Sequence, residues 1–168
     1  DDISFWKQHW KNKIEIFNRT RLTDWDNYSS RRYYKILLED IINEIGLEVE
    51  NKKILEIGAG SGLLSLLMAA KGAEVYVVDI LPEAIKYMQI LEKKLRDVLP
   101  AFYGSVNYII NGFNEMTKEE VPYNYFDIVH NAGVIEEYDL NTAGNIILQM
   151  KNCARRGGII IVGVPNFF

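Results

Sequence analysis

The chain has 168 residues, 19 basic and 23 acidic side chains, a formal net charge of −4 and 48% hydrophobic residues. This length is typical of one globular domain, whose core needs neither disulfides nor a structural metal. The acidic balance disfavours a nucleic-acid partner, because nucleic-acid binders usually carry a basic excess. The apolar stretches are shorter than the roughly 20 residues that span a bilayer, so we expect no membrane segment. The single cysteine, Cys153, forms no internal disulfide and favours a cytoplasmic location.

The first part of the chain is predicted to form two helices. A stripe at helical spacing predicts the first, and its members are Trp6, Trp10, Ile14 and Phe17. A second apolar stripe over residues 34–45, ended by Gly46, predicts the next. We assign residues 1–48 to these helices, packing on or lidding a ligand site, and residues 49–168 to an α/β domain. The aromatic stripe itself either lids a pocket or packs into the core.

Strand and helix patterns alternate from residue 53 onward. Short β-branched runs predict five strands, at residues 54–57, 75–79, 106–110, 126–130 and 159–163. Longer apolar periodicities predict helices between them, at residues 63–71, 82–99 and 142–154. The last helix is expected to lead through a Gly157-Gly158 turn into the fifth strand. Strands that are apolar on both faces and separated by helices indicate a doubly wound parallel sheet, α/β in class.

A glycine-rich segment follows the first predicted strand. Gly58, Gly60 and Gly62 alternate there, so the backbone can turn sharply and approach a ligand with no Cβ in the way. Glu56 precedes them, and Asp79 ends the second strand on the same rim of the sheet, where it can accept hydrogen bonds from both hydroxyls of a ribose. The dinucleotide fingerprint would place its third glycine where this chain has Leu63. An acid at Glu56 suits a ligand with a positive ammonium group better than a pyrophosphate.

With these residues in place, the sequence resembles the class I S-adenosylmethionine-dependent methyltransferases. Their first motif is matched by residues 56–62, and their acidic residue after the second strand by Asp79. Their third motif is similar to residues 111–113, and their fourth-strand motif to residues 126–136. The Gly157-Gly158 turn and the segment after it are similar to the fifth strand of the family. The resemblance implies a Rossmann-like sheet of order 3-2-1-4-5, S-adenosylmethionine as cofactor, and methyl transfer.

The resemblance also implies a role for each matched residue. Glu56 would lie near the cofactor ammonium group, Asp79 would hold the ribose, and Ile80 would pack on the adenine. The residues expected beneath the methionyl part of the cofactor are Gly58, Ala59, Gly60 and Gly62. The residues expected along the adenine edge are Asn111, Gly112 and Phe113. Asn131 and Ala132 would line the channel near the sulfonium.

Several of these residues have a structural interpretation as well. The glycine segment is, in that interpretation, a tight strand-to-helix turn without a ligand. Asp79 can cap the helix that begins near Pro82. His130 is either a catalytic base or a packed, hydrogen-bonded strand-end residue. Glu136, with its neighbour Glu137, either orients a substrate amine or belongs to a solvated edge.

The residues after the fourth strand bear on the substrate. Amino-group DNA methyltransferases carry Asp/Asn-Pro-Pro-aromatic there, whereas this chain has His-Asn-Ala-Gly at residues 130–133. No carboxylate cluster with metal spacing follows, so we expect no metal and no catechol-type mechanism. A small molecule is the expected methyl acceptor. The alternatives are a cofactor-binding module that is not competent without a partner or further chain, and a nicotinamide-dependent oxidoreductase, against which Glu56 and Leu63 argue.

The last predicted strand, over residues 159–163, is expected at one edge of the sheet. The family normally has two further strands after the fifth, and this sequence has no segment to match them. A bare apolar edge strand invites pairing with another chain. We therefore expect either a C-terminally truncated domain or a homodimer formed through this edge.

Overall fold

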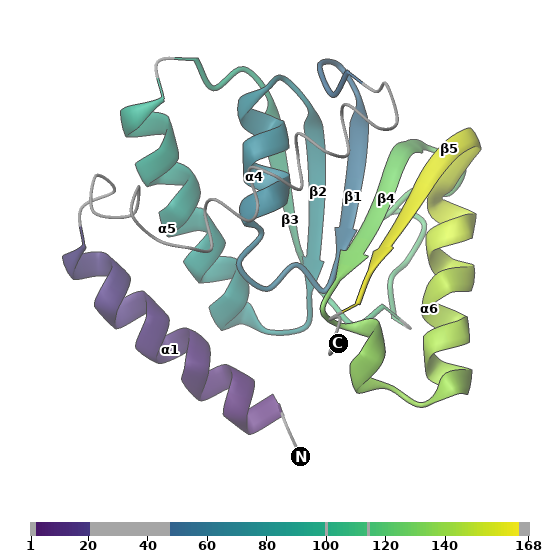
Figure 1. The fold of residues 1–168 in the computed structure, drawn as a ribbon, viewed down its shortest axis with the longest axis horizontal. Coiled ribbons are helices and arrows are strands. Elements are labelled where there is room, and N and C mark those ends of the chain that lie inside the picture. Colours follow the sequence, from purple (N-terminus) through teal and green to yellow (C-terminus); the bar gives the residue numbers. More distant parts are fainter. Residues whose placement is uncertain (1–2, 21–47, 100, 114, 165–168) are drawn as a thin grey trace.

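A computed structural model of the chain describes residues 3–20, 48–99, 101–113 and 115–164 (Figure 1). The first predicted helix is present, and the second, at residues 34–45, lies outside the described residues. In chain order the elements are α1 (Ile3–Arg19), β1 (Lys53–Ile57), α4 (Leu63–Ala70), β2 (Glu74–Asp79), α5 (Pro82–Val98), β3 (Ser105–Ile110), β4 (Phe126–Ala132), the 3-10 helix η1 (Ile135–Glu137), α6 (Leu140–Cys153) and β5 (Ala154–Gly163).

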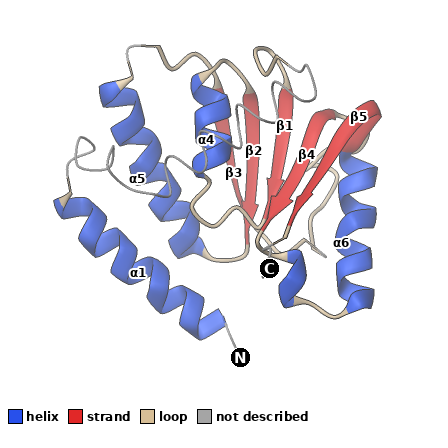
Figure 2. Cartoon of the chain, in the orientation of Figure 1, coloured by secondary structure: helices blue, strands red, loops and turns tan. Residues whose placement is uncertain are grey.

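The five strands form one sheet in which every pairing is parallel (Figure 2). Their order is β3-β2-β1-β4-β5, which confirms the predicted order. Parallel strands need crossover connections, and helices lie in three of them: α4 between β1 and β2, α5 between β2 and β3, and α6 between β4 and β5 (Figure 1). Because β1 lies in the middle and its neighbours β2 and β4 lie on either side, the carboxyl ends of these three strands meet at one rim of the sheet.

Alternate residues of each strand supply the two halves of the core. Ile54 and Val75 pack on the side of α4 and α5. Leu55 and Val129 pack on the opposite side, against residues of α6 that include Met150. All five side chains are fully buried. Because side chains alternate along a strand, Glu56 lies on the same side of the sheet as Ile54, the side that α4 covers.

Helix α1 packs along α5, as Figure 1 shows. The rings of Trp10 and Phe17 each lie 5.2 Å from the ring of Tyr87, so this part of the predicted aromatic stripe belongs to the core. Trp6 is 38% exposed. Lys94 of α5 donates hydrogen bonds to the carbonyl oxygens of Phe17 and Thr20 at the end of α1. The ammonium group thus caps the C-terminal end of α1, where the Phe17 carbonyl oxygen also accepts from the Thr20 N–H at 3.2 Å.

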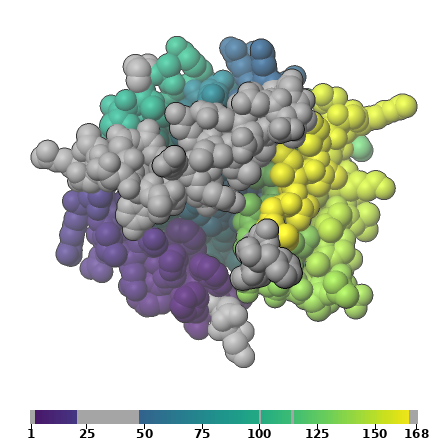
Figure 3. All heavy atoms as spheres, in the orientation of Figure 1, coloured from purple at the N-terminus to yellow at the C-terminus, as the bar shows by residue number. Residues whose placement is uncertain are grey.

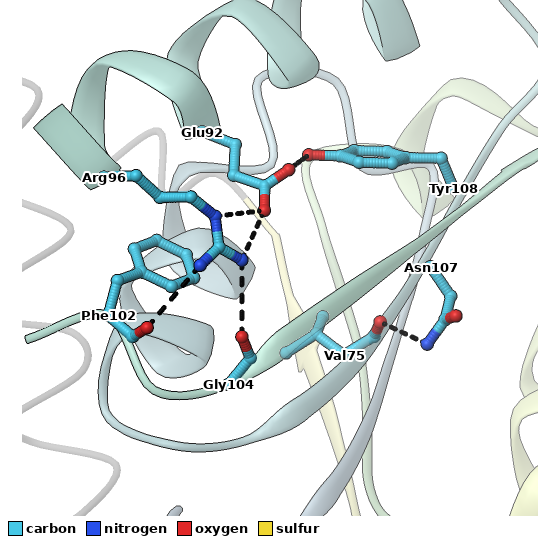
Figure 4. Close-up of polar contacts among 7 residues, drawn as sticks. All are labelled: Val75, Glu92, Arg96, Phe102, Gly104, Asn107 and Tyr108. Atoms are coloured by element: carbon cyan, nitrogen blue, oxygen red, sulfur yellow. Dashed lines mark hydrogen bonds and ion pairs between the residues drawn. The ribbon is translucent and has the colours of Figure 1, made fainter.

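A polar network joins α5 to the edge strand β3 (Figure 4). The Glu92 carboxylate accepts from the Tyr108 hydroxyl at 2.7 Å and from the Arg96 guanidinium at 2.7 Å. Arg96 also lies over the ring of Phe102, 3.9 Å from its centroid, and donates to the carbonyl oxygen of Gly104. A Cβ on Gly104 would lie 2.0 Å from the carbonyl oxygen of Ala73, so no side chain fits there.

The start of β5 corrects the sequence prediction. The strand begins at Ala154, directly after α6, and not beyond a Gly157-Gly158 turn. Ala154 pairs with Phe126, whereas the next pair joins Ile159 to Ile128, so additional residues bulge out between the two pairs. Gly157 has a φ of +76° in this bulge, and a Cβ on Gly158 would lie 2.8 Å from the carbonyl oxygen of Phe126.

Beyond the bulge, β5 forms an edge of the sheet and reaches the surface (Figure 3). Ile160 and Val162 are 37% and 40% exposed. The predicted apolar edge is therefore present among the described residues. None of the described helices combines the length and the apolar character needed to cross a membrane.

Candidate glycine-loop site

The predicted glycine segment forms the turn between β1 and α4 at the carboxyl rim of the sheet. Gly58, Gly60 and Gly62 have φ values of +68°, +53° and +59°, a left-handed region that L side chains rarely adopt. The N–H groups of Gly58 and Ala59 donate to the carbonyl oxygen of Val78 at 2.8 and 3.1 Å. The loop is therefore tied to the end of β2.

Other elements approach the three glycines so closely that a Cβ at any of them would require a neighbouring side chain to move. A Cβ on Gly58 would lie 2.5 Å from Val134, and one on Gly62 would lie 2.1 Å from the sulfur of Met88. One on Gly60 would lie 3.3 Å from the indole of Trp10. The N-terminal helix α1 thus reaches the loop through Trp10. That residues 1–48 pack on or lid a ligand site stays a prediction, and residues 21–47 lie outside the described residues.

Asp79, the last residue of β2, bridges the loop and the start of α5. Its Oδ2 accepts from the Gly60 N–H and its Oδ1 accepts from the Leu81 N–H, both at 2.8 Å. The side chain is 8% exposed, and burial raises its pKa, an effect that the two hydrogen bonds oppose. Asp79 orders the turn before Pro82 without capping a helical N–H. The carboxylate lies at the rim position that the sequence predicts.

Glu56, in β1 below the loop, is buried with one oxygen unsatisfied. The residue is 6% exposed, and Oε2 has no hydrogen-bond partner among the residues that the structure describes. Burial raises the pKa of Glu56 to about 8, against a hydrogen bond from Ser65 that lowers it, and the nearby Asp79 charge raises it further. A buried carboxyl without a full set of partners is costly unless a ligand completes it.

His130, in β4 beside Glu56, lies inside the protein and away from solvent. The ring is 2% exposed, and burial lowers its pKa to about 4, so it is neutral near pH 7. Its Nε2 lies 3.1 Å from the hydroxyl oxygen of Ser65, and its Nδ1 lies 3.7 Å from Glu56 Oε1 without a hydrogen-bond partner. Because burial favours the uncharged form of both Glu56 and His130, their contact is not an ion pair. This placement favours the hydrogen-bonded interpretation of His130 over the catalytic one.

Asn131 and Ala132 end β4 next to the loop. The Asn131 side chain is fully buried and donates from Nδ2 to the carbonyl oxygen of Ile57 at 2.7 Å, while its Oδ1 has no partner. Ala132 is exposed at the rim. The two residues therefore flank the glycine loop from the β4 side, and their predicted position near a sulfonium stays a prediction.

The residues predicted for the adenine edge gather at the ends of β2 and β3. Ile80 is 54% exposed, and its Cδ1 would lie 3.8 Å from a Cβ on Gly112. Phe113 contacts Tyr138 edge to face, with ring centroids 5.6 Å apart. The Asn111 side chain bonds within its own loop: it donates to Glu120 and to the carbonyl oxygen of Glu115 and accepts from the Gly112 N–H. Its described contacts therefore hold the loop after β3.

The remaining predicted candidate, Glu136, lies exposed in η1. Its Oε1 would lie 3.8 Å from a Cβ on Gly133. Among the described residues no group of three or more His, Cys, Asp or Glu side chains is placed to hold a metal ion. A groove between α1 and α5 is lined by none of the predicted site residues; its lining is Lys11, Ile14, Pro82, Glu83 and Lys86.

Sequence reasoning missed Ser65 and the contact of Trp10 with the loop. Ser65 is the one polar residue of α4, whose sequence is LLSLLMAA, and it is fully buried. A lone polar residue inside an apolar helix is a usable signal, because a buried hydroxyl needs a partner. The Trp10 contact joins residues 50 positions apart, and helical periodicity carries no information about such a pair.

Comparison with known proteins agrees with this geometry. A family model described as a methyltransferase domain matches residues 28–167. The mitochondrial ubiquinone biosynthesis O-methyltransferase of Schizosaccharomyces pombe is 31% identical over 134 residues, which are 76% of this chain and 46% of that protein. The release factor glutamine methyltransferase of Dictyoglomus turgidum is 37% identical over 76 residues, which are 43% of this chain and 27% of that protein.

A solved structure shares the fold. The magnesium protoporphyrin IX methyltransferase of Synechocystis PCC 6803, crystallised with bound S-adenosylmethionine, superposes with a TM-score of 0.58 at 18% identity, over 74% of this chain and 54% of that one. The chain thus spans about half the length of that enzyme and of the yeast relative. The family model, which matches most of the chain, and the 3-2-1-4-5 sheet with its glycine loop together show that the chain belongs to the class I S-adenosylmethionine-dependent methyltransferase family.

Proposed function

We propose that the protein transfers a methyl group from S-adenosylmethionine to a small molecule. The observation that carries this proposal is the buried Glu56 carboxyl, whose Oε2 has no partner and lies in the strand that leads directly into the glycine loop. A ligand with an ammonium group would satisfy that oxygen. The glycine loop, which leaves no room for a Cβ, and the rim carboxylate Asp79 fit the rest of such a cofactor.

In this proposal the rim residues share the binding of the cofactor. Glu56 accepts from its ammonium group, Asp79 accepts from the ribose hydroxyls, and Ile80 covers one face of the adenine. The residues that pass beneath the methionyl part are Gly58, Ala59, Gly60 and Gly62. The residues along the adenine edge are Asn111, Gly112 and Phe113. Asn131 and Ala132 line the channel toward the acceptor.

The cofactor supplies an electrophilic methyl group, so the protein mainly has to align the acceptor in line with the C–S bond. A base is needed only if the acceptor must lose a proton. His130 is buried and already bonded to Ser65, which makes it a poor base for an external acceptor. Exposed Glu136 remains the candidate for that role.

Similarity supports a small-molecule acceptor. The name of the yeast relative describes an O-methyltransferase of ubiquinone biosynthesis, and the solved neighbour methylates magnesium protoporphyrin IX. The Dictyoglomus relative acts on a glutamine of a protein, but its match is confined to 76 residues. The chain spans only part of the length of these proteins. Both the identity of the acceptor and the activity of the whole protein are therefore part of this proposal.

Two measurements test the proposal. Isothermal titration of the folded chain with S-adenosylmethionine should give a saturable one-to-one isotherm, and Asp79→Ala should abolish it. Release of S-adenosylhomocysteine should then appear with a panel of small phenols and other small nucleophiles, and not with a glutamine-containing peptide. Binding of the cofactor without turnover on any acceptor would favour the alternative function, a cofactor-binding module that is not catalytically competent without a partner or further chain. Absence of binding would overturn the proposal.

We propose further that the edge of β5 pairs with a second copy of the chain. Ile160 and Val162 place partly exposed apolar side chains on a strand that pairs on one side only, within the described residues. Sedimentation velocity should show a dimer that Val162→Lys converts to a monomer. A monomeric wild type at high micromolar concentration would overturn this part.

A further inference from the structure

The middle glycine of the loop, Gly60, is faced by helix α1. Atoms Cζ2 and Cη2 of Trp10 lie 3.3 and 3.8 Å from the position of a Cβ on Gly60. Apart from the chain neighbours of Gly60, no other atom of the described residues lies within 4 Å of that position. The two outer glycines are faced instead by α5 and by the segment after β4. Helix α1 thus meets the loop at its middle glycine.

The backbone of the same glycine is held by Asp79. Its Oδ2 accepts from the Gly60 N–H at 2.8 Å. Gly60 has a φ of +53°, and a glycine without restraints leaves this conformation as readily as it adopts it, because it has no side chain to limit its backbone. Asp79 restrains the N–H of Gly60, and Trp10 fills the space beside its Cα. The two contacts together limit the freedom of the loop at its centre.

Contacts with α5, and not with the loop, determine where α1 presents Trp10. The two helices run side by side (Figure 1). On the first turns of α1, the ammonium groups of Lys7 and Lys11 lie 3.7 and 4.0 Å from Glu83 Oε1. At the other end of α1, Lys94 donates to two backbone carbonyl oxygens. Because α5 holds α1 near both ends, the indole is a fixed surface against which the loop packs.

We propose that Trp10 is a positioning residue, which packs on Gly60 and so holds the glycine loop in the conformation that binds the cofactor. This inference rests on the proposed function, in which Gly60 passes beneath the methionyl part of the cofactor. When the outer ring of the indole is removed, Gly60 gains backbone freedom that the cofactor must then take away on binding. The cost of fixing the backbone of one residue corresponds to a loss of affinity of about tenfold.

The test compares the affinities of wild type and Trp10→Phe for S-adenosylhomocysteine by isothermal titration. This ligand shares the amino-acid, ribose and adenine groups of the cofactor. The two atoms that face Gly60 belong to the outer ring of the indole, which phenylalanine lacks, whereas a phenyl ring can still pack on α5. Trp10→Phe should therefore bind the ligand between about threefold and about tenfold more weakly than wild type.

Phe17→Leu is the matched control for damage to the packing of α1. The Phe17 ring lies 5.2 Å from the Tyr87 ring, as the Trp10 ring does, but Phe17 is about two helical turns further along α1. Phe17→Leu should lower the free energy of unfolding about as much as Trp10→Phe, which urea unfolding without ligand measures. It should leave the affinity for S-adenosylhomocysteine within about twofold of wild type.

The coupling between α1 and the loop must act in both directions. If the Trp10 contact raises the affinity by some factor, the bound ligand must hold α1 on α5 more firmly by the same factor. Amide hydrogen exchange measures this under conditions where α1 opens without global unfolding. S-adenosylhomocysteine should slow exchange in α1 of wild type and of Phe17→Leu, and much less in Trp10→Phe. A residue that only stabilises the fold would not produce this difference.

The outcomes distinguish this inference from the proposed function. If wild type does not bind S-adenosylhomocysteine, the proposed function fails and this inference fails with it. If wild type binds and Trp10→Phe binds within about twofold of it, the proposed function stands and the role of Trp10 is overturned. The role is also overturned if Phe17→Leu loses as much affinity as Trp10→Phe, or if the ligand does not slow exchange in α1 of wild type.

Discussion

Glu56 and Asp127 lie on the adjacent strands β1 and β4, near opposite ends of the sheet, and their surroundings differ. Asp127 accepts from the backbone N–H of Lys53 at 2.9 Å and from Arg155 at 2.7 Å. Burial opposes its ionisation, but these two partners prevail and hold the pKa of Asp127 below its ordinary value. No Lys or Arg of the described residues forms an ion pair with Glu56, and burial raises its pKa to about 8.

The comparison separates a carboxylate whose two oxygens the protein itself satisfies from one whose second oxygen has no partner among the described residues. Both are partly or fully buried, so burial alone does not distinguish them. The difference is whether the protein itself supplies donors to both oxygens. At the amino end of β4 it does, since each Asp127 oxygen has a donor, whereas Glu56 Oε2, toward the carboxyl rim, has none.

The largest expected effect is on cofactor affinity. Glu56→Gln removes the acceptor charge, so affinity for S-adenosylhomocysteine should fall about a hundredfold at pH 7.5, which corresponds to about 2–3 kcal/mol for a buried charge-assisted contact. Asp127→Asn should leave the affinity within about twofold, since Asp127 lies at the opposite end of the sheet. Isothermal titration of the two variants measures both. Equal losses would erase the distinction between the two carboxylates.

The second effect is on the pH dependence of stability. The folded-state pKa of Glu56 is raised from 4.5 to about 8, so its protonated form stabilises the fold fully below about pH 4.5, and that stability is lost as the pH rises toward 8. Urea unfolding without ligand should show a decline of about 1.4 kcal/mol per pH unit between about pH 5 and 7.5 from this group. Glu56→Gln should lack this slope. A wild-type curve that is flat over the same range would contradict the assigned pKa shift.

Asp127 should show the opposite dependence and a smaller effect. Its folded-state pKa is lowered, so its contribution is present above the ordinary value of 3.8 and is lost as the pH falls through the lower folded value. Asp127→Asn should lower the free energy of unfolding at pH 7 by about 1 kcal/mol, since it weakens two hydrogen bonds. Unfolding at pH 7 and at pH 3 should show the difference narrowing at the lower pH. A difference that widens instead would count against the pairing.

Arg155→Met should have the smallest effect. The Arg155 side chain is 47% exposed, and its ion pair with Asp127 is screened by solvent, so the loss at pH 7 should be about 0.5 kcal/mol or less. High salt should reduce the difference further. If this variant were as unstable as Asp127→Asn, the ion pair rather than the Lys53 N–H would dominate the environment of Asp127.

Alternating apolar runs and the glycine loop are local signals, and they were sufficient for most element positions. The sheet order came from the resemblance to the methyltransferase family, because strand order is not a local property of the sequence. The sequence was misleading at Gly157-Gly158, because a pair of glycines is equally compatible with a turn and with a strand bulge. Only the pairing of β5 with β4 distinguishes the turn from the bulge. The positions of Glu56 and Asp79 at the rim could be predicted, because each residue lies at or near the carboxyl end of a predicted parallel strand. The contact of Ser65 with His130 could not, because the two residues lie 65 positions apart in the sequence.

The contact between Trp10 and Gly60 has an optical consequence. The indole is 9% exposed and packs against Tyr87 on its way to the loop, so its near-ultraviolet emission should be blue-shifted relative to that of Trp6, which is 38% exposed. The N-terminal helix therefore carries a native fluorophore whose spectrum reports the conformation of a loop 50 residues further along the chain.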